Sequence, residues 1–342
     1  IQDISPSGWI KIRGVKPDLQ NEKSYCNYSF VCSYKNIVPL PDKETATPFK
    51  ICSFDIEASS SHGDFPLPLK SYKKLAMNIV DVLKSQESII KESNIKDFLY
   101  KIIFTAFGYG KLENIDKVYP KKKCKKEEIK KILDEYIDID VLNIKNGLWD
   151  QRKEYMIKNT ELFGSEDDNN DENVDDKQTK LFVQKKNSII KKGSTIIDYL
   201  LSKKSRDEKI TALDIALTSI LPDLKGDDVT FIGSTFLKYG ETEPYRNHCL
   251  VLGGCDDVPG VDIETCKDER TLLKSWTQLI CDEDPDIIIG YNIFGFDYKF
   301  MIERAEELKC KAKFLELGRI LGEESRVIDS SIKIASGTHD LK

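Results

Sequence analysis

Residues 49–58 read FKICSFDIEA and place two acidic side chains, Asp55 and Glu57, in an otherwise apolar stretch. The apolar residues predict a strand, in which successive side chains point to opposite faces of a sheet. Because Asp55 and Glu57 are two positions apart, both carboxylates lie on the same face. An acidic pair is common at exposed sheet edges, but the apolar neighbours argue against an ordinary solvated edge. This stretch therefore predicts a sheet strand that carries a carboxylate pair.

A second acidic motif lies far along the chain, where residues 284–297 read DPDIIIGYNIFGFD. The three consecutive isoleucines predict a buried strand over residues 286–292. Asp297 stands at the start of a predicted helix that extends from residue 296 to about 309. Carboxylates on a strand and at a helix start are what a two-cation site for phosphodiester chemistry requires.

The three carboxylates of Asp55, Glu57 and Asp297 suit a magnesium site. Two cations about 3.5–4 Å apart can activate a water and stabilise the leaving oxygen during phosphodiester cleavage. Mg²⁺ prefers hard oxygen ligands and keeps some of its waters, so two or three carboxylates suffice. We expect Asp55 with Glu57 to hold one ion and Asp55 with Asp297 the other, and Mn²⁺ to substitute. Without metal, the converging charges should raise the pKa of at least one carboxyl group.

The composition bounds the class of protein. The chain has 342 residues, enough for two domains or for one domain with a large insertion. Its 40% hydrophobic residues permit a sizeable core, and its 32% charged residues favour a well-solvated surface. The net charge of -6 argues against wholesale wrapping of nucleic acid but permits a local basic channel. No apolar run approaches the ~20 residues of a membrane span.

Cysteine usage indicates the compartment. The nine cysteines form no Cys-x-x-Cys pair, their number is odd, and no signal peptide is present. These features predict free thiols in a reducing compartment. We therefore expect an intracellular protein that is not secreted.

Four stretches differ in character along the chain. Residues 1–46 are short β-like stretches, and residues 47–71 carry the first acidic motif and a polar loop. Helical periodicity dominates residues 72–225, in which an acidic stretch near 165–177 predicts a disordered loop. β character returns over residues 226–342. We expect an α/β fold with a β-rich N-terminal segment and a ribonuclease H-like mixed sheet, interrupted by a large, mainly helical insertion.

Local patterns predict individual elements of the second β-rich part. Alternating residues predict two paired strands over 229–237 and 248–252, and an amphipathic pattern predicts a helix over 271–281. Asp284-Pro285 ends that helix, because the residue before proline disfavours helical geometry.

Five lysines between residues 121 and 126 form a basic block within the helical part. Such a block could contact template phosphates. The pattern favours the solvated start of a helix instead, because Glu127 and Glu128 follow directly.

The two acidic motifs resemble those of a known family. Residues 54–58, FDIEA, are similar to exonuclease motif I of the family B DNA polymerases, and residues 284–297 are similar to motif II. The resemblance covers about residues 1–70 and 226–342 and is strongest to the delta-like replicative enzymes of large double-stranded DNA viruses. Three shorter segments also resemble delta-type enzymes, namely Gly8-Trp9, residues 63–66 and residues 326–331.

The resemblance implies a fragment of a DNA-directed DNA polymerase that replicates viral DNA, covering its 3′→5′ proofreading exonuclease region. Asp55, Glu57 and Asp297 would be catalytic residues and ligands of a two-ion Mg²⁺ site. Three further residues would bind the unpaired 3′ end of the DNA primer: Phe54, Asn292 and Phe296. The full-length enzyme would use dNTPs, with a sliding clamp as a candidate partner, in the host nucleus or a cytoplasmic virus factory.

The sequence departs from the family pattern after Asp297. Motif III, a tyrosine followed after three residues by an aspartate, does not occur there. Tyr136 and Asp140 have the spacing but precede motif II, and the polymerase motifs are absent. We therefore expect a fragment truncated before motif III, with little or no nuclease activity of its own. A free-standing exonuclease and a non-catalytic nucleic-acid-binding scaffold stay open as alternatives.

Overall fold

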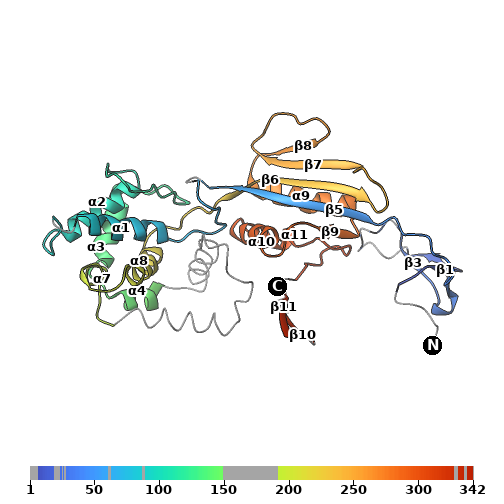
Figure 1. Cartoon of the computed structure of the whole chain (residues 1–342), viewed down its shortest axis with the longest axis horizontal. Coiled ribbons are helices and arrows are strands. Elements are labelled where there is room, and N and C mark those ends of the chain that lie inside the picture. The colour runs from blue at the N-terminus through green and yellow to red at the C-terminus, as the bar shows by residue number, and fades with distance from the viewer. Residues whose placement is uncertain are drawn as a thin grey trace. The chain divides into compact units, whose positions relative to one another are not determined.

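The computed structural model divides the chain into two compact units, Ile1–Ser59 with Asp228–Lys342 and Ser60–Asp227 (Figure 1). It describes residues 7–18, 24, 26, 28–60, 63–86, 89–148 and 192–326, together with the backbone of two strands after residue 329. The predicted disordered loop near 165–177 lies outside the described residues.

The first unit is built on a mixed five-stranded sheet in the order β8-β7-β6-β5-β9. Antiparallel pairs join β5 to β6 and β6 to β7, whereas β7 pairs with β8 and β5 with β9 in parallel. The α/β character and the mixed sheet predicted from the sequence are confirmed. The strands are β5 (Lys50–Ser59), β6 (Asp228–Lys238), β7 (Arg246–Leu252), β8 (Asp262–Cys266) and β9 (Ile287–Ile289).

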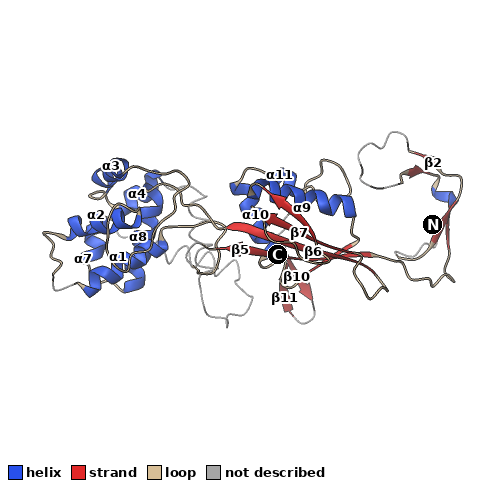
Figure 2. Ribbon diagram, turned by 90° about the horizontal axis from the view of Figure 1, so that it is seen from above, coloured by secondary structure: helices blue, strands red, loops and turns tan. Residues whose placement is uncertain are grey.

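Three helices cover one face of this sheet, as Figures 1 and 2 both show: α9 (Glu269–Glu283), α10 (Asp297–Glu307) and α11 (Lys311–Phe314). The core between them contains Phe54 from the sheet and Trp276, Phe300 and Phe314 from the helices. The Asp268 side chain caps α9 by accepting a hydrogen bond from the Thr271 N–H (2.8 Å). The helix ends at Glu283, just before Pro285, as the sequence predicted.

Strand β9 differs from its prediction. The isoleucine run predicted a buried strand over residues 286–292, but β9 has three residues and lies at the edge of the sheet. Within the described residues it pairs with β5 and no other strand, through Ile51, Cys52 and Ser53. Ile288 packs against the core, whereas Ile287 and Ile289 are exposed, because adjacent strand residues face opposite sides and the helices cover only one.

Short β ladders make up the rest of the first unit. Near the N-terminus β1 (Ile10–Ile12) pairs with β4 (Ile37–Pro39), and β2 (Lys16–Pro17) pairs with β3 (Phe30–Val31). A short 3₁₀ helix, Tyr34–Asn36, precedes β4. Near the C-terminus β10 (Ser330–Ile334) and β11 (Gly337–Leu341) form a hairpin.

The second unit is helical and has its own apolar core. Helix α8 lies deep in that core, because residues 212–220 are all buried. No helix among the described residues is long and apolar enough to cross a membrane. The helices are α1 (Lys73–Ser85), α2 (Ile95–Ala106), α3 (Lys126–Tyr136), α4 (Val141–Leu148), α7 (Ile196–Leu201) and α8 (Arg206–Ile220).

A buried ion pair ties the helices to the sheet in the first unit. Arg304 of α10 donates to the Glu269 carboxylate of α9 from Nε (2.9 Å) and Nη2 (2.6 Å), and both side chains are buried. Glu269 also accepts a hydrogen bond from the Val229 N–H of β6 (2.9 Å), and Arg304 reaches Asp228 (3.2 Å). One carboxylate therefore holds α9, α10 and β6 together.

We predict that Arg304→Met destabilises the first unit by about 3–5 kcal/mol, because it leaves the Glu269 carboxylate buried without its partner. Chemical denaturation followed by circular dichroism measures the loss. The double variant Arg304→Met with Glu269→Gln should recover most of it, because the amide is neutral and its oxygen can still accept from Val229. A double variant as unstable as the single one would contradict this account of the pair.

Candidate active site

The carboxylate pair of β5 lies on the face of the sheet opposite the helices. Residues of β5 alternate, so that Cys52, Phe54 and Ile56 are buried while Asp55 and Glu57 are exposed. The period of two predicted this arrangement from the sequence. Both carboxylates therefore reach the open face from the strand that the sheet holds between β6 and β9.

A β-bulge lies beside Glu57. The register between β5 and β6 shifts after Glu57, which pairs with Phe231, to Ala58, which pairs with Val229. Thr230 is the extra residue, and its hydroxyl donates to the backbone carbonyl of Glu57 (3.0 Å). Bulges increase the local twist and change the direction of neighbouring side chains. The bulge therefore helps to set the direction of Glu57.

Asp297 meets the first motif at a single backbone amide. It is the first residue of α10 and only 2% exposed. Its Oδ1 accepts a hydrogen bond from the Ile56 N–H (3.2 Å), and Asp55 Oδ1 accepts from the same N–H (3.0 Å). The two carboxylates therefore share one donor, although Asp55 is the neighbour of Ile56 in the sequence and Asp297 lies 241 positions away from it.

The proximity of these carboxylates changes the ionisation of one of them. Burial, and next the hydrogen bond with Asp55, raise the pKa of Asp297 to about 6. The Ile56 N–H opposes part of this rise by stabilising the carboxylate. A raised pKa in one carboxyl group is what the sequence predicted for converging acidic side chains without metal.

Residues 290–296 form the loop that precedes Asp297 and places it beside β5. Gly290 comes so close to β5 that an added Cβ would lie 2.8 Å from the Phe54 carbonyl oxygen, and it would also meet the Ile293 side chain. Ile293 is buried and holds the middle of the loop in the core. Its carbonyl accepts from the Tyr298 N–H (2.8 Å), which joins the loop to the first turn of α10.

Asn292 shapes the same loop. It is exposed and has a positive φ of 50°, and its carbonyl accepts from the Phe296 N–H (3.0 Å). A Cβ at Gly295 would meet the Asn292 side-chain amide, so the present position of that amide requires glycine at 295. The structure therefore shows Asn292 as part of the loop's turn, with its side chain close to Gly295.

The ring of Phe54, a residue that the resemblance assigns to binding of the DNA 3′ end, lies in the core and not on the open face of the sheet. The ring is 3% exposed, with its centroid 4.8 Å from that of Trp276 and 5.1 Å from that of Tyr298. Because strand neighbours face opposite sides, a residue adjacent to an exposed Asp55 must face the core. Phe296 is half-buried, with its centroid 5.5 Å from that of Phe300.

Two exposed aromatic residues of the loop were not predicted from the sequence to be part of the site. Tyr291 is 94% exposed and Phe294 is 68% exposed. Residues 288–290 and 292–294 line an open hollow of about 300 Å³. The signal that could have found both residues is their position in the glycine-bounded loop between β9 and Asp297.

The donor chemistry of the Asp55–Asp297 pair fits a hard divalent cation. Two carboxylates share one N–H donor, and a cation between them would stabilise the ionised form of Asp297, which burial and the neighbouring Asp55 disfavour. Glu57 lies on the same strand face as Asp55. Among the described residues, however, no group of three or more His, Cys, Asp or Glu side chains is gathered for metal binding. The structure therefore joins two of the three predicted ligands, and the role of Glu57 stays a prediction.

A mixed sheet with carboxylates converging beside its motif-bearing strand is suited to metal-assisted phosphodiester cleavage. The chain matches the model of the DNA polymerase family B exonuclease domain over residues 2–146 and 152–340. The chain therefore belongs to the family B DNA polymerases, of which it covers the exonuclease region.

Individual relatives agree with this membership. The chain is 36% identical over 376 residues to the DNA polymerase of Phaeocystis pouchetii virus, covering 100% of this chain and 34% of that protein. It is 34% identical over 348 residues to the DNA polymerase of Pyramimonas orientalis virus, covering 95% and 25%. The DNA polymerase delta catalytic subunit of Arabidopsis thaliana is 41% identical over 110 residues, 32% of this chain and 10% of that subunit. The chain thus spans about a third or less of each of these relatives.

We predict that Gly290→Ala displaces the loop from β5 and destabilises the first unit by about 1–3 kcal/mol, because the new methyl group meets backbone. Thermal unfolding measures the effect. Gly318→Ala in the same unit is the matched control, because a Cβ there meets nothing within 4 Å. Equal melting temperatures for the two variants would contradict the close approach at Gly290.

We predict that Asp297→Asn stabilises the metal-free protein at pH 7 by up to about 3 kcal/mol. The folded pKa of Asp297 lies above its ordinary value, so ionisation removes stability as the pH rises through about 4 to 6. The gain should therefore disappear below about pH 4. Urea denaturation in EDTA at both pH values tests this.

Asp256→Asn is the control for that measurement, because Asp256 lies in an exposed loop of the same unit. A gain for Asp297→Asn that is equal at both pH values would contradict the assigned cause.

Proposed function

We propose that the first unit is a metal-dependent 3′→5′ exonuclease and that it proofreads for a DNA-directed DNA polymerase that replicates viral DNA. The observation that carries the proposal is the pairing of Asp55 and Asp297 on the Ile56 N–H, in a chain that belongs to the family B exonuclease domain. The names of the two viral relatives support the assignment to a viral polymerase.

The proposed domain is ribonuclease H-like, with residues 72–225 as a mainly helical insertion. Its support is that Ser60–Asp227 forms a compact unit of its own, while the strands before and after it pair as β5 and β6. The extent of the similarities agrees, because the two viral polymerases match nearly the whole chain and the Arabidopsis thaliana subunit matches 32% of it.

In this proposal Asp55, Glu57 and Asp297 hold two Mg²⁺ ions, for which Mn²⁺ can substitute. The ions supply an activated water and stabilisation of the leaving oxygen. Asp297, with its pKa raised in the metal-free protein, gives up any proton it holds when it becomes a ligand. The exposed position of Asp55 and Glu57 on the open sheet face leaves them accessible to a DNA end.

The 3′ nucleotide of the DNA would lie against the loop of residues 290–296. Tyr291 and Phe294 are the exposed rings on which unpaired bases can stack, and stacking tolerates any base. Asn292 and Phe296 would border the same nucleotide, whereas Phe54 supports β5 from the core. In this proposal the loop binds the DNA end, and β5 supplies carboxylates for the chemical step.

The remaining partners belong to the full-length polymerase. It would bind primer and single-stranded DNA, use dNTPs, and have a sliding clamp as a candidate partner. It would act inside the cell, in the host nucleus or in a cytoplasmic virus factory. The basis of this part is the resemblance to viral replicative polymerases.

We predict that the full-length polymerase with Asp55→Ala and Glu57→Ala loses excision of a mispaired 3′ end but keeps primer extension, because only the exonuclease carboxylates are removed. Gel analysis of a labelled primer with a mispaired end measures both activities. Asp256→Ala with Asp257→Ala removes two exposed carboxylates from a loop of the same unit and should change neither.

Normal excision by the Asp55 and Glu57 variant would overturn the site. Efficient degradation of single-stranded DNA by residues 1–342 alone would instead favour a free-standing exonuclease. Retention of DNA binding without carboxylate-dependent excision or Mn²⁺ binding would favour a scaffold.

A further inference from the structure

A lysine-rich surface lies in the second unit, on the segment between α2 and α3. Residues 117–126 read KVYPKKKCKK, with six lysines and no acidic residue, in a chain whose net charge is -6. All six lysines are exposed. We call this set the lysine surface: Lys117, Lys121, Lys122, Lys123, Lys125 and Lys126.

Backbone hydrogen bonds hold the lysine surface in a defined shape. The Lys121 N–H donates to the Asp223 carbonyl (2.9 Å), and the Lys225 N–H donates to the Tyr119 carbonyl (2.8 Å). The Val118 N–H also donates to the Ala106 carbonyl (2.9 Å), which joins the segment to the end of α2. A ligand that binds here therefore meets side chains on an already ordered backbone.

Among the residues that the structure describes, no carboxylate forms an ion pair with the middle of this surface. Lys121 pairs with Asp223 (3.3 Å), and the Lys126 ammonium lies 5.0 Å from the centroid of the Phe104 ring. For Lys122, Lys123 and Lys125, the described part of the chain contains no carboxylate within ion-pair distance. These three ammonium groups therefore project a surplus of positive charge into solvent.

The acidic residues that follow have another role. Glu128 accepts a hydrogen bond from the Lys125 backbone N–H (2.7 Å) and so caps the start of α3. The sequence left two interpretations of the lysine block open, a helix start and a phosphate contact. In the structure it is the Glu128 side chain that caps the start of α3. The helix start therefore does not explain why so many lysine side chains are present.

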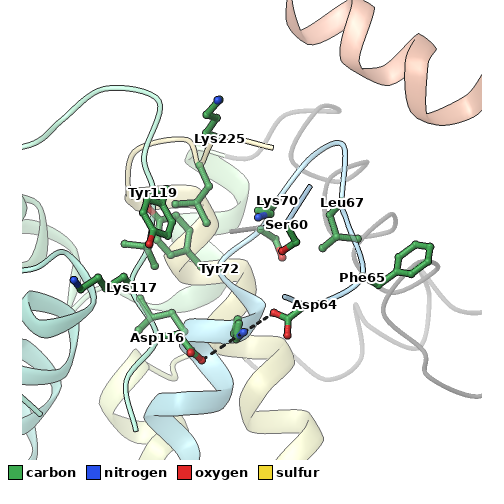
Figure 3. Close-up of a pocket in the computed structure, with 15 residues that line it drawn as sticks. Ser60, Asp64, Phe65, Leu67, Lys70, Tyr72, Asp116, Lys117, Tyr119 and Lys225 are labelled. Carbon is green, nitrogen blue, oxygen red and sulfur yellow. Dashed lines mark hydrogen bonds and ion pairs between the residues drawn. The ribbon is translucent and has the colours of Figure 1, made fainter. Parts of the chain in front are cut away.

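A cavity of about 90 Å³ borders the lysine surface, and Lys117 and Tyr119 are among the residues that line it (Figure 3). Two other lysines of its lining are paired with carboxylates: Lys70 with Asp227 (2.6 Å), and Lys74 with Asp64 (2.5 Å) and Asp116 (3.7 Å). Because the charges of Lys70 and Lys74 are compensated inside the unit, we do not count these two lysines as part of the lysine surface.

We propose that the lysine surface is a second DNA contact of this chain, which binds the phosphate backbone without reading its sequence. A row of exposed ammonium groups on a fixed backbone matches the repeating charges of a nucleic acid, and binding releases the counterions that those phosphates hold. Tyr119 lies within the segment and Tyr109 precedes it in the sequence. Both are exposed and offer aromatic surface to bases. The choice of DNA over another polyanion rests on the proposed function.

The test measures binding of the 342-residue chain to labelled single-stranded and duplex DNA by fluorescence anisotropy, in EDTA so that no excision occurs. Lys122→Gln, Lys123→Gln and Lys125→Gln together should weaken binding about tenfold or more at low salt and lower the salt slope by about two. The corresponding triple arginine variant keeps the charge and should bind like the wild type.

The control removes three other exposed lysines of the same unit, Lys84, Lys91 and Lys203, by substitution with glutamine. It should leave the affinity nearly unchanged. Equal losses in both triple variants, or no loss in the first, would overturn the proposal. Competition by polyglutamate as strong as that by DNA at equal charge, or tighter binding to vesicles of anionic lipid, would overturn DNA as the partner.

This outcome is separate from that of the exonuclease proposal, because no metal and no catalysis enter the binding assay. Loss of DNA binding in the glutamine triple variant stands whether or not Asp55→Ala with Glu57→Ala abolishes excision. Conversely, excision that depends on those carboxylates stands even if the lysine surface binds nothing.

Discussion

The arrangement of the site depends on one backbone amide, the Ile56 N–H. It donates to Asp55 beside it in the chain and to Asp297 at the start of a distant helix. Burial, and next the hydrogen bond with Asp55, raise the pKa of Asp297 to about 6, and the shared N–H donor offsets only part of this rise. In the metal-free protein the ionised form of Asp297 is therefore disfavoured, and a cation between the two carboxylates would stabilise it.

Packing away from the amide keeps the two carboxylates together. The Arg304–Glu269 ion pair fixes α10 against α9 and β6, and α10 carries Asp297 at its first position. Gly290 brings the preceding loop against the backbone of Phe54, one residue before Asp55. The buried ion pair and the close backbone contact at Gly290 thus both hold Asp297 near Asp55.

Each unit carries a local cluster of charged side chains, and the two clusters have opposite sign. The first unit concentrates carboxylates at its open sheet face, and the second carries an ordered row of lysines. The proposed exonuclease function, which rests on membership of the family B exonuclease domain, would account for the carboxylates. It does not by itself account for the lysines, which is why the lysine surface is open to a separate experimental test.

Much of the first unit followed from local patterns. The period of two in residues 49–58 predicted β5 and the common face of Asp55 and Glu57, and Asp284-Pro285 predicted the end of α9. The strand of residues 286–292 was predicted as buried, because an isoleucine run has the same composition at the centre and at the edge of a sheet. Strand β8 was not predicted, since its sequence DIETC has few apolar residues.

By itself the sequence determined the β5 strand, its carboxylate pair and the two motifs that resemble family B exonucleases. Only the tertiary structure decided that Asp297 is buried beside Asp55, that Phe54 faces the core, and that Tyr291 and Phe294 stand exposed. The physical reason is that periodicity fixes which side chains share a face of one element. Which face is covered, and which distant residue shares a hydrogen-bond donor, depends on how the elements pack together.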